Sequence, residues 1–109
     1  MTTSITVRPI GKTTLIACTT AASTPVLITP SSPDQMNYAH FVNTGTQPVA
    51  IKIAQSSTNA LYPVNGTPAD YVLNHDSDVI LTVPSAPFYV SAITGTSTST
   101  LFVTPVDAQ

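Results

Sequence analysis

The chain has 109 residues, of which 7% are charged and 42% hydrophobic, and its formal net charge is -2. This length fits one domain with its own core, and the hydrophobic content predicts an ordered chain. Because the acids outnumber the bases and no basic patch is present, binding to nucleic acid is not expected. No apolar run approaches the roughly 20 residues of a membrane span, so a membrane partner is not expected either.

Extended segments rich in β-branched and apolar residues recur about every ten residues, with turn-forming residues between them. No stretch carries apolar residues at helical spacing. The predicted strands, in chain order, are 4–8, 13–18, 25–29, 37–43, 48–54, 70–74, 78–83, 88–93 and 99–104. This pattern predicts an all-β fold, a single-domain antiparallel β-sandwich over residues 1–109, for which a jelly roll is one arrangement.

Both chain ends and one internal segment depart from the regular pattern, since residues 1–3 and 105–109 lack periodicity and residues 55–69 are irregular. Residues 1–8 are predicted to form an N-terminal arm, whose β-prone part would pair with this domain or with the sheet edge of a neighbour. Residues 55–69 form the longest irregular segment, and a loop of this length in a small domain is usually either functional or unstructured. Residues 105–109 are predicted to be a C-terminal tail.

Glycines mark two of the predicted turns. In residues 43–47, Gly45 follows Asn43 at a position where a hairpin requires a positive φ, and Gly95 occupies a similar position in residues 94–99. Both segments are therefore predicted to be hairpin turns, with Asn43, Gly45 and Gly95 as structural turn residues.

Alternation in the last strand assigns its two faces. Leu101 and Val103 are expected to point into the core, while Thr100, Phe102 and Thr104 point the other way. Phe102 is then either an exposed aromatic side chain or one that a partner covers.

Residues that would support catalysis or hold a metal are few. His75, Asp76 and Asp78 lie close together in the sequence, and this cluster could hold a divalent cation by oxygen ligands, but Asn and Asp between two strands more often form a turn. His40 lies inside a predicted strand, where a structural histidine is expected. With no Glu, one Cys and scattered acids, the chain is predicted not to be an enzyme, and no cofactor or metal is expected.

A carbohydrate- or receptor-binding module is the alternative outside the structural proteins. Tyr62 and Tyr71 lie in and beside the long loop, where their rings would offer a platform for a sugar. Against this function, the chain has no Trp, and two tyrosines beside a loop also suit packing at the edge of a core.

The stretches "FVNTGTQPVAIKIA" (41–54) and "PFYVSAITGTSTSTLFVTPV" (87–106) resemble a family of short virion structural proteins of tailed bacteriophages. In that family an Asn-x-Gly turn leads to an alternating apolar strand, and the chain closes on two strands joined by a Thr/Ser/Gly turn. The resemblance covers about residues 37–105. The chain departs from the family where "QSS" follows the first stretch, instead of "FG", and where "VDAQ" follows the final "TP".

The resemblance implies a capsid decoration or cement protein that stabilises contacts between capsid subunits, or else a head-to-tail or tail accessory protein. The implied partner is the major capsid protein, and the implied location is the capsid surface of a virion made in the cytoplasm of a bacterial host. The symmetric sites of a shell favour self-association as a dimer or trimer. The predicted partner interface consists of Ile5, Val7, Tyr62, Tyr71, Thr98, Thr100 and Phe102.

Overall fold

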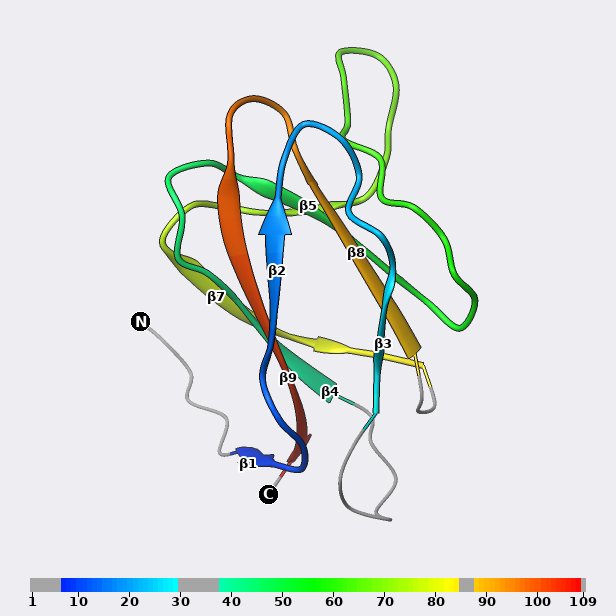
Figure 1. Cartoon of the computed structure of the whole chain (residues 1–109), viewed down its shortest axis with the longest axis vertical. Helices are drawn as coiled ribbons and strands as arrows, with labels where there is room; N and C mark the ends of the chain where they lie inside the picture. The colour runs from blue at the N-terminus through cyan, green and yellow to red at the C-terminus, as the bar shows by residue number, and fades with distance from the viewer. Residues whose placement is uncertain (1–6, 30–37, 85–87, 109) are drawn as a thin grey trace.

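The computed structural model describes residues 7–29, 38–84 and 88–108, and the regular structure of these residues is entirely β-strand (Figure 1). Each predicted segment overlaps one strand of the structure. In chain order the strands are β1 (Val7–Pro9), β2 (Thr14–Cys18), β3 (Val26–Ile28), β4 (Tyr38–Asn43), β5 (Val49–Ala54), β6 (Tyr71–Leu73), β7 (Ser77–Thr82), β8 (Phe88–Thr94) and β9 (Ser99–Ala108).

The strands form two antiparallel sheets that pack face to face. Sheet A contains β9, β4 and β7 in that order, with β1 and β2 paired along the other edge of β9, and sheet B has the order β3-β8-β5-β6. The antiparallel pairs β2 with β9, β3 with β8, β4 with β7 and β5 with β6 are nested within one another along the chain. This nested pairing is the jelly-roll arrangement, so the predicted β-sandwich is confirmed in that form.

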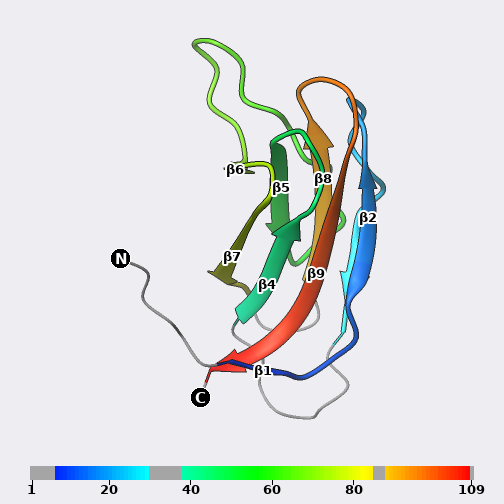
Figure 2. The ribbon, with the colours of Figure 1, turned by 90° about the vertical axis from the view of Figure 1, so that its left-hand side faces the viewer.

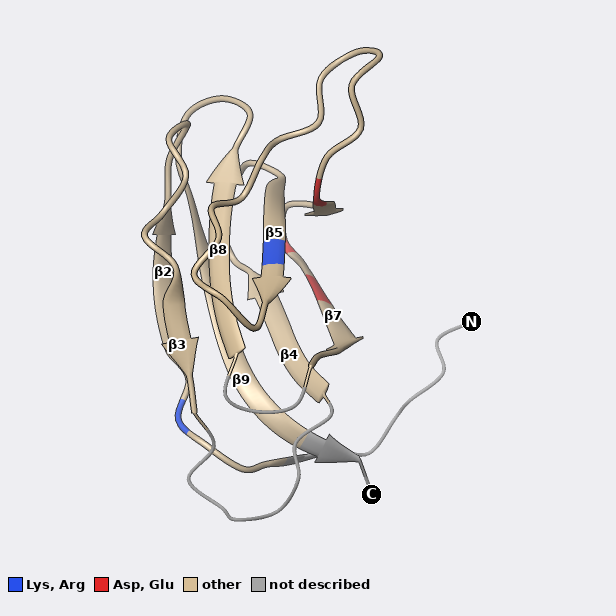
Figure 3. Ribbon diagram, turned by 90° about the vertical axis from the view of Figure 1, so that its right-hand side faces the viewer, with Lys and Arg blue, Asp and Glu red and all other residues tan. Residues whose placement is uncertain are grey.

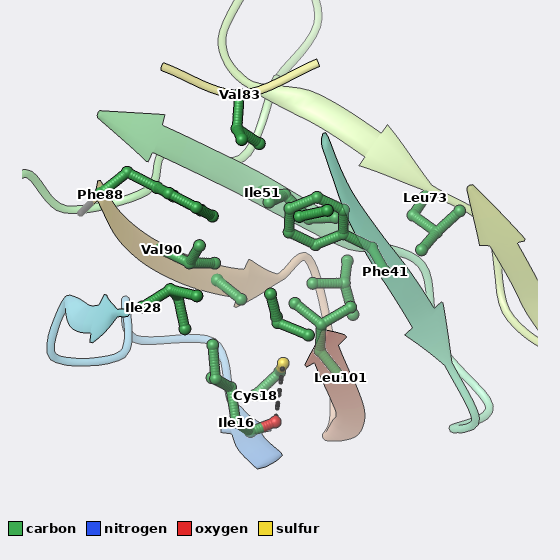
Figure 4. Close-up of a cluster of buried hydrophobic side chains, with 14 of the residues drawn as sticks. Ile16, Cys18, Ile28, Phe41, Ile51, Leu73, Val83, Phe88, Val90 and Leu101 are labelled. Atoms are coloured by element: carbon green, nitrogen blue, oxygen red, sulfur yellow. Dashed lines mark hydrogen bonds between the residues drawn. The ribbon is translucent and has the colours of Figure 1, made fainter. Parts of the chain in front are cut away.

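Alternating side chains fill the space between the sheets. Phe41 of β4 and Phe88 of β8 bring one aromatic ring from each sheet into the core (Figure 4). Leu101 and Val103 of β9 are fully buried, as their alternation predicted, and burial of each such side chain contributes about 2 kcal/mol. Phe102 lies half-buried on the opposite side of β9.

The two glycine turns connect strands of different sheets, so the prediction of two hairpins was wrong. In a jelly roll most consecutive strands lie in opposite sheets, and a short turn between alternating segments does not imply that they pair. The predicted positive φ at Gly45 and Gly95 was also wrong. In the second turn the positive φ, 57°, belongs to Ser97, and among the described glycines only Gly66 has one, at 81°.

The chain ends differ from the prediction as well. β9 continues to Ala108, with β1 paired to its last three residues and β4 paired to it as far as Val106. The predicted tail at 105–109 was therefore wrong for residues 105–108, because partners distant in the sequence hold them in a strand. Of the predicted N-terminal arm, Val7 and Arg8 pair within this same domain, whereas Ile5 lies outside the described residues.

Candidate functional site

The longest connection between described strands, residues 55–70, is fixed to sheet B at its base. The Ala60 backbone N–H donates to Ser91 Oγ at 3.0 Å, and Ala60 and Ser91 are both buried. The Leu61 N–H donates to Asp70 Oδ2 at 2.7 Å, and the Asp70 N–H donates back to the Leu61 carbonyl oxygen at 3.2 Å. Lys52 Nζ of β5 lies 3.7 Å from Asp70 Oδ1. These contacts order the loop across the outer side of sheet B (Figure 3).

The tip of the same loop is a small hydrogen-bonded turn. The Thr67 N–H donates to the Val64 carbonyl oxygen at 2.8 Å, and the Val64 N–H donates to the Thr67 carbonyl oxygen at 3.2 Å. Gly66 lies inside the turn with a φ of 81°, where a side chain would be strained. The loop is thus a formed structure and not a slack connection.

This ordered loop and the strand after it expose apolar side chains to solvent. Leu61 is 66% exposed and Val64 is 63% exposed, and in β6 Tyr71 is 49% exposed. Val72 of β6 is also exposed, on the face of the strand opposite to that of Tyr71. We call the two loop residues, Leu61 and Val64, the loop patch. Apolar side chains that an ordered loop holds in solvent make this loop a candidate contact surface.

Tyr62 and Tyr71, the predicted sugar platform, have different surroundings. The ring of Tyr62 packs on Gly95 in the turn between β8 and β9, so closely that a Cβ added at Gly95 would lie 2.8 Å from Tyr62 Cε1. Tyr62 therefore joins the loop to the body of the sandwich, whereas Tyr71 is available to a partner. Gly95 is required for this close approach and not for its backbone angle.

A second candidate surface is the outer side of sheet A, shown in Figure 2. Leu15, Phe102 and Val42 lie level with one another on β2, β9 and β4. On the next level along the strands, Thr104, His40 and Ile80 lie side by side on β9, β4 and β7. We call the surface made by these six side chains face A. It includes Phe102, a predicted interface residue, and Thr100 lies at its margin on the same side of β9.

One corner of face A adjoins an open pocket of about 360 Å³ between the end of β4 and the start of β7. His40 Nε2 lies 2.8 Å from Asp78 Oδ2 at its wall, and Asp76 and Ser77 line it as well. Residues 74–76 form a turn, in which Asp76 has a φ of 50°. Among the described residues no group of three His, Cys, Asp or Glu side chains is placed to hold a metal ion.

Cys18 is buried at the end of β2, where its thiol donates to the carbonyl oxygen of Ile16 at 3.4 Å (Figure 4). Burial raises the pKa of the Cys18 thiol to about 11, and a hydrogen bond with the backbone of Leu101 opposes this shift. A thiol with this pKa is almost entirely protonated at neutral pH, so Cys18 contributes packing and no nucleophile.

The raised pKa of Cys18 predicts a loss of stability in alkaline solution. The thiol ionises near pH 8.5 in an unfolded chain but near pH 11 in the folded protein, so between these values the unfolded state has released a proton that the native state keeps. The free energy of unfolding should be maintained below about pH 8.5 and fall toward pH 11, and Cys18→Ala should remove this part of the fall. Urea denaturation of the wild type and of Cys18→Ala across this pH range measures the free energy of unfolding. An equal pH dependence in the two proteins would contradict the assignment of the fall to the Cys18 thiol.

Comparison with known proteins supplies a fold and no family. No family model and no curated protein matches the chain. Among solved structures the crystal structure of PirA is similar, with a TM-score of 0.54 and 14% sequence identity over 85% of this chain and 92% of that chain. At this identity the likeness supports the shared all-β sandwich fold alone. The described residues contain no helix that is long and apolar enough to cross a membrane.

The predicted interface residues do not form one surface. Thr100 and Phe102 lie on the outer side of sheet A, Thr98 is exposed in the turn before β9, and Tyr62 and Tyr71 belong to the loop and to β6. Ile5 lies outside the described residues, and Val7 lies in β1. Sequence reasoning missed two exposed loop residues, Leu61 and Val64, and two members of the Phe102 row, Leu15 and Val42.

Proposed function

We propose that this protein is a virion structural protein that decorates the capsid and stabilises contacts between capsid subunits, and that the loop patch is its contact surface. One observation carries the proposal: the 55–70 loop is ordered by hydrogen bonds at its base and tip, yet it holds Leu61 and Val64 in solvent. An ordered apolar loop loses little conformational entropy when it binds, so its apolar area contributes efficiently to affinity.

The surface chemistry of the chain also supports an adhesive function. Only 7% of the residues are charged, so few charges lose their hydration when the molecule packs against a neighbour. A decoration protein binds at many equivalent sites, and contacts that are weak singly become sufficient when neighbouring sites are filled. The resemblance of residues 37–105 to phage virion proteins points to a capsid as the surface concerned.

A binding experiment tests this function directly. Particles of a phage that carries this gene, with the gene deleted, are incubated with the purified protein and then sedimented. Wild-type protein should co-sediment at a copy number comparable with that of the major capsid protein. The double substitution Leu61→Asp and Val64→Asp should weaken binding by more than about tenfold, because it places two charges in an apolar contact.

The matched control for this experiment is Leu27→Asp, an exposed apolar residue of β3 outside the loop patch. This variant should bind like the wild type. Wild-type protein that does not co-sediment, or variants that all bind equally, would overturn the proposal. The position of the bound protein on the particle can also be observed after labelling the protein. If the protein binds only at the neck or tail, it is a head-to-tail or tail accessory protein instead.

A carbohydrate- or receptor-binding module is the second candidate, favoured by the exposure of Tyr71 beside the ordered loop. Aromatic rings bind the apolar faces of sugars, and jelly rolls also serve as lectin domains. A glycan array signal that Tyr71→Ala abolishes would support this function, and a blank array would exclude it for the glycans displayed. Tyr62→Ala is a poorer test, since Tyr62 packs on Gly95.

A further inference from the structure

The tip of the 55–70 loop presents the single Asn-Gly pair of the sequence, Asn65 and Gly66. The tip projects beyond the ends of the strands (Figure 2), and both residues are exposed. They occupy the two central positions of the turn that the hydrogen bonds between Val64 and Thr67 close. No atom lies within 4 Å of a Cβ added at Gly66. The peptide group between Asn65 and Gly66 can therefore rotate without displacing a neighbour.

An asparagine can react with the backbone of the residue that follows it. The next backbone nitrogen is close enough to the side-chain carbonyl carbon to attack it and close a small ring. Glycine in the next position helps, because it has no Cβ to obstruct the approach. The backbone N–H must also be available, since a hydrogen bond to a fixed acceptor holds the nitrogen in place and must be broken before the nitrogen can attack.

The Gly66 N–H meets this requirement, and its counterparts elsewhere do not. Within the part of the chain that the structure describes, no group accepts a hydrogen bond from the Gly66 N–H. After each other described asparagine, the next backbone N–H already donates: from Thr44 to the Thr100 carbonyl oxygen at 3.1 Å, from Ala60 to Ser91 Oγ at 3.0 Å, and from His75 to Asn74 Oδ1 at 2.9 Å. In the last of these the nitrogen turns its proton, and not its electron pair, toward the amide. The structure thus singles out Asn65.

We propose that Asn65 is a self-modification site, at which the folded protein deamidates without an enzyme. The Gly66 backbone nitrogen attacks Asn65 Cγ and gives up its proton. The new bond between this nitrogen and Cγ closes a succinimide ring, while the bond from Cγ to Nδ2 breaks and ammonia leaves with the proton. Water then adds to either carbonyl carbon of the ring and breaks its bond to the nitrogen, which leaves aspartate or isoaspartate. One water is consumed, one ammonia is released, and no atom is oxidised or reduced.

Both products change the loop tip. Aspartate replaces a neutral amide with a carboxylate next to Val64 of the loop patch. Isoaspartate adds a methylene group to the main chain, so the paired hydrogen bonds between Val64 and Thr67 lose their spacing. The base of the loop keeps its own hydrogen bonds, from Ala60 to Ser91 and between Leu61 and Asp70. A consequence that rests on the proposed function is weaker capsid binding by the deamidated protein, because a charge would then enter an apolar contact.

Peptide mapping by mass spectrometry tests the reaction without a capsid. The folded protein is incubated in neutral buffer and sampled over time. Asn65 should convert about tenfold or more faster than Asn43, Asn59 and Asn74. Asn65→Gln should keep its amide, because a glutamine side chain has to close a larger ring, which forms slowly. An Asn65 that stays unmodified in the folded protein, or that converts no faster than the other three, would overturn the proposal.

Ala60→Gly separates the effect of structure from that of sequence. It creates a second Asn-Gly pair at 59–60, where the backbone N–H should still donate to Ser91 Oγ. In the folded variant Asn59 should therefore convert about tenfold or more slowly than Asn65, whereas in urea the two should convert at similar rates. Equal rates in the folded variant would overturn the role assigned to the open Gly66 N–H. Thermal denaturation checks that the variant is folded during the incubation.

Co-sedimentation with the gene-deleted particles tests the consequence for binding. Incubated wild-type protein, with Asn65 converted, should bind more weakly than Asn65→Gln incubated in the same way. Equal binding of the two would overturn the effect on the loop patch, while the peptide maps decide independently whether Asn65 deamidates. Freshly purified wild-type protein that fails to bind would count against the proposed function alone.

Discussion

Replacing Asn43 with aspartate is expected to destabilise the fold by about 4 kcal/mol at neutral pH, a large part of the roughly 5 to 15 kcal/mol that stabilises a domain. Asn43 is buried at the end of β4, 1% exposed. Its Nδ2 donates to the backbone carbonyl oxygens of Gln47 at 2.8 Å, Leu73 at 3.2 Å and Asn74 at 3.1 Å. One amide group thereby joins the turn after β4 to the turn before β7.

The other atom of the same amide completes the junction. Asn43 Oδ1 accepts the Gly45 N–H at 3.1 Å and the Ser99 hydroxyl at 2.7 Å, so the start of β9 is tied to the same side chain. An aspartate would keep these two acceptor contacts, but its second oxygen would face three carbonyl oxygens with no proton to donate. A substitution that buries a charge without a compensating partner strongly lowers the free energy of unfolding.

The pH dependence of this variant follows from the same geometry. Burial among carbonyl oxygens should raise the pKa of an aspartate at position 43 above the value of about 3.9 in an unfolded chain. The folded state then favours the protonated acid, so the loss of stability should be smaller near pH 4 and should grow as the pH rises. Urea denaturation at both pH values measures it. The matched control is Asn65→Asp in the exposed loop, and equal losses in the two variants would contradict the role given to Asn43.

The strands were predictable from the sequence because alternation is a local property. Residues 99–104 alternate so clearly that the inward Leu101 and Val103 and the outward Phe102 were assigned correctly from pattern alone. Which sheet a strand joins is decided by partners far along the chain. For this reason the turns at 43–47 and 94–99 were wrongly predicted as hairpins, and residues 105–108 were wrongly predicted as a tail although β1 and β4 pair with them.

The candidate surfaces were predictable only in part, for the same reason. Phe102 was expected on an outer face, but its row with Leu15 and Val42 exists only through the register of three strands. In the long loop, attention to aromatic rings favoured Tyr62, whereas the more exposed side chains are Leu61 and Val64. The sequence does show apolar residues in this irregular segment. Only the hydrogen bonds at the base of the loop, which the structure reveals, identify these residues as part of an ordered surface.

Gly45→Ala is expected to destabilise the fold by about 3 kcal/mol. The cause is steric, whereas the sequence predicted that Gly45 is needed for a positive φ. A Cβ added at Gly45 would lie 2.8 Å from Ser99 Cα, which belongs to the backbone of β9 and cannot rotate away. Inserting a methyl group into a filled space typically costs 1 to 3 kcal/mol, and a backbone neighbour puts this site at the upper end. Gly45 therefore lets the turn after β4 approach the start of β9, where the Asn43 amide joins them.

A comparison of two glycine variants separates the steric cause from the conformational one. Gly66 has a φ of 81° and no atom within 4 Å of an added Cβ, so Gly66→Ala should cost only about 1 kcal/mol, from backbone strain. If Gly45 were required for its backbone angle, the two variants would lose similar stability. Because the obstacle at Gly45 is Ser99, the added substitution Ser99→Gly should recover part of the loss in Gly45→Ala, although it also removes a hydrogen bond to Asn43. Chemical denaturation of the single and double variants measures this coupling, and its absence would show that the close approach is not what requires glycine here.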